Sequence, residues 1–220
     1  LIIVNGENAA HGRGITKKIY KEFMEMGIQM ITMGNHTFSN RELISFIDDE
    51  TINIVRPCNY YETPGVGYKV INYNGKKVLI INALARTYMN LSLENPFLVV
   101  EKILNKVEHD YSFIDFHGEA TSEKIAFGHY FDGKVDAIVG THTHIPTADE
   151  RILPKGTLYI TDVGMTGPLN GIIGVDKNII IARFINGLSD RNQVADGPRW
   201  LNGVIIDLTN KKIERIQITE

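Results

Sequence analysis

The chain has 220 residues, a formal charge of −3 and 43% hydrophobic residues, which is enough for a single domain over residues 1–220 with its own core. Cys58 is the only cysteine, so the sequence excludes an intrachain disulfide and a zinc site built from several thiolates. Mixed charges argue against a large basic surface for bulk DNA binding, and no apolar run reaches the ~18 residues of a membrane span.

Apolar runs rich in β-branched residues alternate with helical patterns in the first half of the chain. Residues 1–5 predict a buried strand, and apolar residues with helical spacing follow from Ile15 to Met26, where Gly27 suits the end of a helix. Asn74 and Gly75 predict a tight hairpin turn. The remaining predicted strands cover residues 28–33, 52–55, 68–73, 78–82, 112–116, 137–140, 158–161, 204–208 and 213–218.

Helices are predicted over residues 41–49 with Asn40 as N-cap, over 96–107 with Pro96 in the first turn, from about residue 120, and over 175–184. Strand and helix alternate early in the chain, and hairpins are added later. This order predicts an α/β fold, a layered sandwich with mixed sheets.

Polar side chains that can bind a metal follow four of the predicted strands. In an open α/β sheet the ligand crevice lies beyond the carboxyl ends of the strands, so side chains at these ends are expected to converge. Two histidines separated by one residue on an extended segment point the same way. The candidate metal ligands are Glu7, Asn8, Asn35, His117, His142 and His144.

Each of these residues alone also has an ordinary structural interpretation. Glu7 could form a salt bridge, Asn35 and His36 could lie in a turn, and His117 could be a buried histidine with satisfied hydrogen bonds. The two later histidines could lie in a surface turn. Their shared position at strand ends favours one site over four unrelated explanations.

One carboxylate, amide oxygens and three imidazoles suit Fe, Mn, Zn or Co. A bridging carboxylate can hold two cations, which together clamp the attacking and leaving oxygens of a displacement at phosphorus and generate hydroxide from water. His36, beside Asn35, is well placed to protonate the leaving oxygen. His11 lies near Glu7 in the chain and is a candidate for substrate contact.

The order of these motifs resembles the calcineurin-like metallophosphoesterases and, more narrowly, the YmdB-type phosphodiesterases of bacteria. Three stretches carry the resemblance: Asn-Gly-Glu-Asn at residues 5–8, Ile-Asp-Phe-His-Gly-Glu-Ala-Thr-Ser-Glu-Lys at 114–124, and Thr-Asp-Val-Gly-Met-Thr-Gly-Pro at 161–168. The similarity extends over essentially the whole chain.

This resemblance implies a four-layered α/β/β/α sandwich with two metal ions, iron first, with manganese or zinc as other choices. It implies that Glu7 is the ligand that bridges the two metals. Asn8 and His144 would bind the first metal, and Asn35, His117 and His142 the second. It implies that His36 donates the proton. The implied reaction is hydrolysis of a small 2′,3′-cyclic or 3′,5′-cyclic nucleotide, or of another phosphodiester, by metal-bound hydroxide.

The family also begins with a strand and an aspartate loop that have no counterpart before Leu1, so we expect an N-terminally truncated sequence. Because that aspartate is a metal ligand in the family, an impaired protein that only binds metal or nucleotide is an alternative function. A single-metal hydrolase acting on C–N bonds is a further alternative, disfavoured because its paired histidines normally come first in the chain.

Two segments outside the ligand set have two interpretations each, one functional and one structural. Thr121 opens a predicted helix whose N-terminus would favour an anion, and Thr166 lies in a loop whose N–H groups could face a phosphate; both could equally be ordinary structure. The chain start has no signal-peptide pattern, so a soluble cytoplasmic protein is expected. The sequence leaves formation of a homo-oligomer open.

Overall fold

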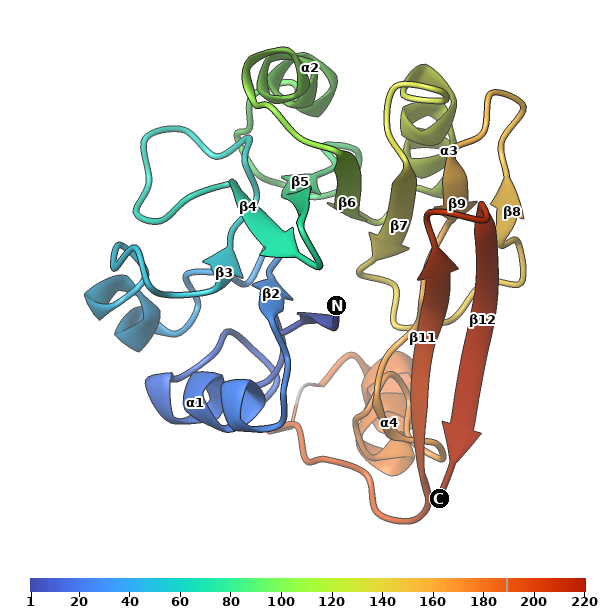
Figure 1. The fold of residues 1–220 in the computed structure, drawn as a ribbon. Helices are drawn as coiled ribbons and strands as arrows, with labels where there is room; N and C mark the ends of the chain where they lie inside the picture. Colours follow the sequence, from blue (N-terminus) through green and yellow to red (C-terminus); the bar gives the residue numbers. More distant parts are fainter. Residues whose placement is uncertain (189) are drawn as a thin grey trace.

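Two β-sheets lie face to face at the centre of the structure, a computed structural model that describes residues 1–188 and 190–220 (Figure 1). The smaller sheet is parallel, in the order β1 (Ile3–Asn5), β2 (Met30–Thr32) and β3 (Ile54–Val55). The larger sheet has the strand order β4-β5-β6-β7-β9-β8, and β5, β6, β7 and β9 run parallel. Its strands are β4 (Tyr68–Tyr73), β5 (Lys76–Leu84), β6 (Tyr111–His117), β7 (Ala137–Thr141), β8 (Arg151–Ile152) and β9 (Leu158–Ile160).

Alternating side chains along the strands produce four layers. In β5, Leu79 and Ile81 pack with α2 (Pro96–Lys106) and α3 (Thr121–Tyr130), whereas Val78 and Ile80 face the smaller sheet. The smaller sheet alternates in the same way, with Ile31 turned toward α1 (Lys17–Glu25) and the 3₁₀ helix η1 (Arg41–Ser45). The order helix, sheet, sheet, helix confirms the predicted α/β/β/α sandwich, in which the larger sheet is mixed and the smaller sheet is parallel.

The face that each strand turns toward the other sheet changes from apolar to polar near its carboxyl end. Val78 and Ile80 are followed on that face by Asn82, and Phe113 is followed by Asp115 and His117. These polar side chains join the two sheets.

Asn82 Oδ1 accepts a hydrogen bond from the N–H of Met33 at 3.2 Å. Asp115 Oδ2 accepts from Asn5 Nδ2 at 3.0 Å and from Thr32 Oγ1 at 2.5 Å. The apolar contact between the sheets thus ends in a polar edge, which is where the candidate ligands lie.

Most predicted elements are confirmed, including the antiparallel hairpin at Asn74 and Gly75, but the segment after Asn40 differs. Asn40 does cap it, since its side chain accepts from the N–H of Glu42. A short 3₁₀ helix forms in place of the predicted longer helix, and Phe46 N donates to Leu43 O at 3.1 Å. Leu43, Phe46 and Ile47 all pack into the α1 side of the smaller sheet, which favours the tighter winding.

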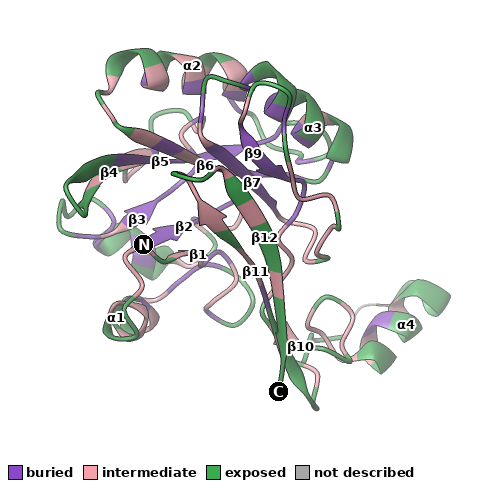
Figure 2. Ribbon diagram, turned by 45° about the vertical axis from the view of Figure 1, so that its right-hand side comes forward, coloured by how far each residue is buried: buried purple, intermediate pink, exposed green. Residues whose placement is uncertain are grey.

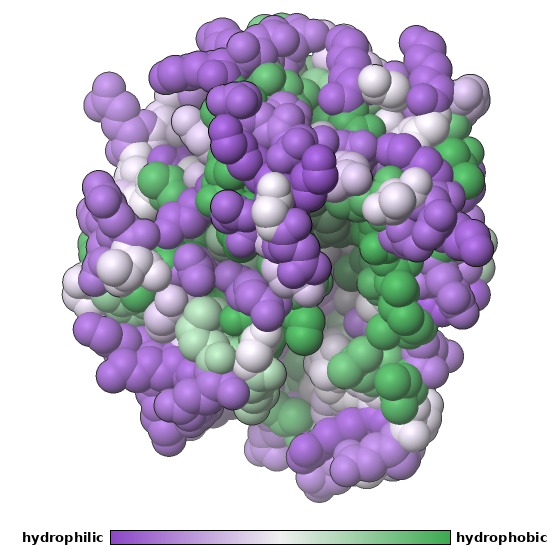
Figure 3. Space-filling view, viewed as in Figure 1, coloured by the Kyte–Doolittle hydropathy of each residue, from purple (hydrophilic) through white to green (hydrophobic). Residues whose placement is uncertain are grey.

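The last part of the chain lies outside the four layers. It comprises α4 (Lys177–Asn186) and a third sheet of β10 (Gly167–Pro168), β11 (Arg199–Asp207) and β12 (Lys212–Thr219). Figure 2 shows α4 set apart from the packed sheets, and its Phe184 and Ile185 are 84% and 81% exposed. Figure 3 shows a column of apolar side chains on the right-hand side of the surface, over the region of β11 in Figure 1. In the described part of the chain, no helix combines the length and apolar character needed to cross a membrane.

Candidate metal centre

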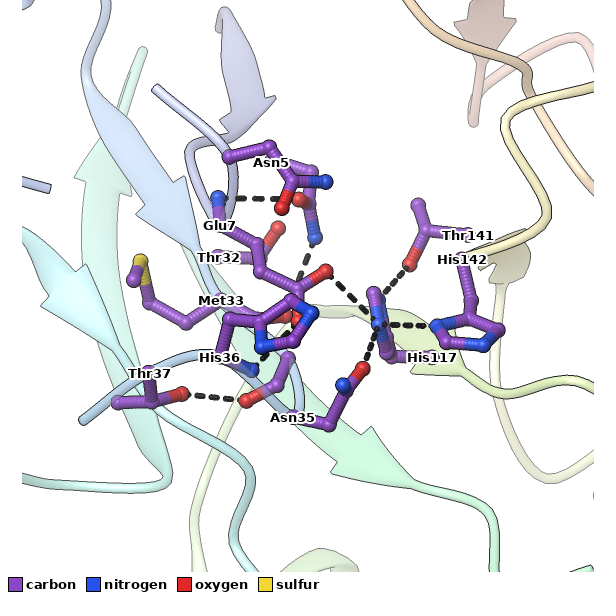
Figure 4. A network of polar contacts seen from close by, with 12 residues as sticks. Asn5, Glu7, Thr32, Met33, Asn35, His36, Thr37, His117, Thr141 and His142 are labelled. Carbon is purple, nitrogen blue, oxygen red and sulfur yellow. Dashed lines mark hydrogen bonds and ion pairs between the residues drawn. The ribbon is translucent and has the colours of Figure 1, made fainter. Parts of the chain in front are cut away.

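The carboxyl ends of β1 and β2 face those of β6 and β7, and the predicted ligands follow these four strands (Figure 4). Glu7 and Asn8 come from the loop after β1, and Asn35 and His36 from the loop after β2. His117 is the last residue of β6, and His142 directly follows β7. The two sheets therefore each supply part of one cluster.

The centre of this cluster is the Nε2 atom of His117, a side chain that is 1% exposed. Glu7 Oε2 lies 2.9 Å from it, Asn35 Oδ1 2.9 Å and His142 Nδ1 3.0 Å. Ligand atoms of Glu7, His117 and His142 all lie within 4.8 Å of one another, as a metal ion would require. Two oxygens that can only accept, and one imidazole nitrogen, thus surround the His117 nitrogen.

The other nitrogen of His117 determines where its proton lies. His117 Nδ1 is 2.8 Å from Thr141 Oγ1, and Thr141 donates its own hydrogen to Asp115 Oδ1 at 2.6 Å. Thr141 must therefore accept from His117 Nδ1–H, so Nε2 is the nitrogen that faces the cluster. A second proton on Nε2 would satisfy only one of the three acceptors. A metal cation satisfies all four lone pairs, so the donor set fits one.

Glu7 brings a negative charge to this cluster. Burial favours the neutral acid, but the charge of His117, its contact with Glu7 and the N–H of His36 lower the pKa of Glu7 to about 2. The His36 N–H donates to Glu7 Oε1 at 2.7 Å, which leaves Oε2 facing His117. Glu7 is thus ionised at neutral pH and 1% exposed.

His142 presents a neutral ring with its lone pair toward the cluster. Burial, and then the charge of His117, lower the pKa of His142 to about 4. Its Nε2 lies 3.1 Å from Glu119 Oε2, so the ring proton belongs there and Nδ1 carries the lone pair. The backbone of His142 has φ +109°, an unfavourable value for any residue other than glycine.

Asn8 and His144 form a second pair beside this cluster. The Asn8 amide lies 3.1 Å from His144 Nε2, and rotating the amide would present its oxygen at the same place. His144 Nδ1 is buried and has no hydrogen-bond partner among the described residues. A buried nitrogen of this kind is costly unless something binds it, so the His144 ring fits a cation at Nδ1, while the Asn8 amide faces its other nitrogen.

His36 contacts the cluster through its backbone. Burial lowers the pKa of its ring, and the charge of Glu7 opposes this shift. Its Nδ1 lies 3.3 Å from Ser39 Oγ, which leaves Nε2 as the nitrogen that can reach a substrate.

The three predicted substrate contacts lie apart from the ligand cluster. His11 is exposed in the loop after β1 with φ +53°, and Thr121 is exposed at the start of α3. Thr166 lines an apolar groove of about 300 Å³ together with Trp200. The structure describes no hydrogen bond from these three side chains to the clustered ligands, so their role remains a prediction.

Sequence reasoning missed the residues that orient the ligands. Asp115 and Thr141 act on His117 Nδ1, and Glu119 faces His142 Nε2. The signal for Asp115 was present, because a residue two positions before His117 lies on the same face of a strand. Glu119 follows the strand in a loop, where no such periodicity exists.

Comparisons with known proteins show which proteins the chain resembles. A family model described as YmdB-like protein matches residues 1–220. A 2′,3′-cyclic-nucleotide 2′-phosphodiesterase from Bacillus subtilis is 51% identical, over 99% of this chain and 85% of that protein. The solved structure of a phosphatase from Mycoplasma pneumoniae matches with a TM-score of 0.90 at 40% identity, over 100% of this chain and 82% of that one.

Two further solved structures come from Thermus thermophilus. A hypothetical protein matches with a TM-score of 0.92 at 36% identity, over 100% of this chain and 88% of that one. A 5′-nucleotidase precursor matches with a TM-score of 0.52 at 14% identity, over 91% of this chain and 41% of that one, which shows a shared fold.

The Thr141 hydroxyl offers a direct test of the proton assignment on His117. In Thr141→Val, Nδ1–H loses its acceptor, and the dissociation constant for Mn²⁺ should rise by about 10- to 100-fold. Calorimetric titration of Mn²⁺ into the metal-stripped chain measures this. Thr157→Val is the control, since that residue is also buried but its hydroxyl binds Val135 O, away from the ligands. Unchanged Mn²⁺ affinity in Thr141→Val would contradict the assignment.

Proposed function

The chain belongs to the YmdB-like protein family, and on that premise we propose that it is a metal-dependent phosphodiesterase acting on 2′,3′-cyclic nucleotides. The observation that carries this proposal is the convergence of Glu7, Asn35 and His142 on His117 Nε2. The name of the Bacillus subtilis relative supports the substrate and the bond that breaks. A 3′,5′-cyclic nucleotide is the other substrate to be compared.

Two metal ions would be held by the two neighbouring groups of side chains. Asn35, His117 and His142 would hold one, Asn8 and His144 the other, and Glu7 would lie between them as the shared ligand. Nitrogen and oxygen donors without a thiolate suit iron, with manganese and zinc as the other expected ions. When bound, such a pair supplies Lewis-acid activation of water and of the phosphate oxygens.

The residues of the chain set the charge of the site and supply the proton for the leaving group. The buried Glu7 carboxylate carries negative charge, and the neutral His142 ring offers a lone pair without adding charge. His117 would offer its Nε2 lone pair once a metal displaces any proton there. Water adds to phosphorus and gives up one proton to solvent as the P–O2′ bond breaks, which leaves a 3′-phosphate and, once the departing oxygen is protonated, a free 2′-hydroxyl. His36 delivers the proton to the departing 2′ oxygen through Nε2, because Ser39 occupies its Nδ1. His11, Thr121 and Thr166 are the proposed substrate contacts outside this centre.

Replacing Glu7 by Gln tests the reaction. The variant loses the negative charge and one of the two equivalent oxygens, so hydrolysis of 2′,3′-cyclic AMP should fall to background and metal content should drop. Chromatography of the nucleotide products and elemental analysis measure the two effects. Glu25→Gln, at the exposed end of α1, is the matched control. Hydrolysis at the wild-type rate by Glu7→Gln, or none by the metal-loaded wild type, would overturn the proposal.

The proton donor is tested separately with His36→Ala. Without the imidazole, kcat for 2′,3′-cyclic AMP should fall by about 10²- to 10⁴-fold, the usual contribution of a general acid. KM and metal content should stay close to wild type, because only the backbone of His36 contacts Glu7. His129→Ala, on the exposed side of α3, serves as control. An unchanged kcat would remove His36 from the mechanism.

A further inference from the structure

Two oppositely charged side chains are buried directly behind residues 142–144, the histidine loop that carries His142 and His144. Lys124 of α3 and Asp162, which follows β9, are each 1% exposed, and Lys124 Nζ lies 2.8 Å from Asp162 Oδ2. Burying two charges costs more than their attraction returns unless further hydrogen bonds compensate. A lysine in the first turn of a helix also opposes the helix dipole. Neither helix formation nor core packing therefore accounts for this pair.

Asp162 connects the pair to the segment that carries His142 and His144. Its Oδ2 accepts from the N–H of Thr143, the residue between the two histidines, at 3.0 Å. Its Oδ1 accepts from the N–H of Gly164 at 2.9 Å. One carboxylate thus holds the histidine loop with one oxygen and the following loop with the other.

The loop after Asp162, residues 163–165, also holds the histidine loop through backbone hydrogen bonds. The N–H of Met165 donates to the carbonyl oxygen of His144 at 3.1 Å, and the N–H of Val163 donates to Gly140 O at 2.9 Å. The Lys124 side chain passes close to Gly140, since its Cδ would lie 3.3 Å from a Cβ placed on that glycine. A side chain at Gly140 would also overlap the carbonyl of Thr161. The close approach of β7 to this loop therefore requires glycine.

The histidine loop needs such support because its backbone is strained. His142 has φ +109° and His144 has φ +67°, values that persist only where the surroundings enforce them. A relaxed loop would turn His142 Nδ1 away from His117 and His144 Nε2 away from Asn8.

We propose that the buried Lys124–Asp162 ion pair is the positioning device that holds His142 and His144 in metal-binding geometry. Lys124 fixes the carboxylate, and the carboxylate fixes the loop through Thr143. This inference rests on the proposed function, and it gives a structural task to two of the sequence stretches that distinguish the family, residues 114–124 and 161–168. Both residues act through the histidines and touch no substrate.

The test measures how fast the full chain, loaded with Mn²⁺, releases the ion to excess chelator. Lys124→Met leaves Asp162 without its partner, and Asp162→Asn leaves one acceptor oxygen for two N–H groups. Each should accelerate release by about 10- to 100-fold, as expected when a residue that orients a metal ligand is lost.

Stability is separated from positioning by two further variants. The double variant Lys124→Met/Asp162→Asn buries no charge, so its urea midpoint should recover toward wild type while Mn²⁺ release stays fast. Asp132→Asn is the matched control: Asp132 is 5% exposed and accepts from the N–H groups of Lys155 and Thr157, one on each oxygen, but contacts no part of the histidine loop. It should lose stability and release Mn²⁺ at the wild-type rate.

Wild-type release from the double variant would overturn this inference, and so would equally fast release from Asp132→Asn, because either result would show that only stability matters. A wild-type chain that retains no Mn²⁺ would overturn the proposed function as well. The first two results leave the wild-type metal centre intact, so the two failures are distinguishable.

Discussion

The carboxylate of Asp115, at the carboxyl end of β6, receives hydrogen bonds from both sheets. Burial raises the pKa of Asp115, and donors from Thr141, Thr32 and Asn5 oppose that shift. Asn5, which donates to Asp115, also accepts the N–H of Glu7. Thr141 connects Asp115 to His117. The hydrogen bonds of Asp115 therefore join the two sheets, and they also orient one ligand from each sheet, Glu7 and His117, toward the same site.

Several atoms with lone pairs face one another around His117 Nε2, so a bound positive charge is needed to satisfy them. Without a metal, a proton on His117 can satisfy Glu7 alone, and Asn35 and His142 still face the same nitrogen. A cation that displaces the proton resolves this conflict, so metal binding should release protons and stabilise the fold. The strained histidine loop and its buried ion pair follow from the same requirement, because His142 must keep its lone pair pointed inward.

Much of this arrangement could be predicted from sequence because parallel strands end at a common edge. That rule alone brought Glu7, Asn35, His117 and His142 into one group, and the hairpin at Asn74 follows from local turn chemistry. Local patterns carry no information on which nitrogen of His117 is protonated or on what faces His142, since Thr141 and Glu119 act through tertiary contacts. Strands β8 and β10 have two residues each, too few for any periodicity.

Anomalous diffraction from crystals of the full chain, recorded at the absorption edges of iron, manganese and zinc, tests the central claim most directly. We expect one peak bounded by Glu7, Asn35, His117 Nε2 and His142 Nδ1, and a second beside Asn8 and His144. Crystals grown with these metals that show no peak there, while His117 Nε2 stays within hydrogen-bonding distance of Glu7, would contradict this claim.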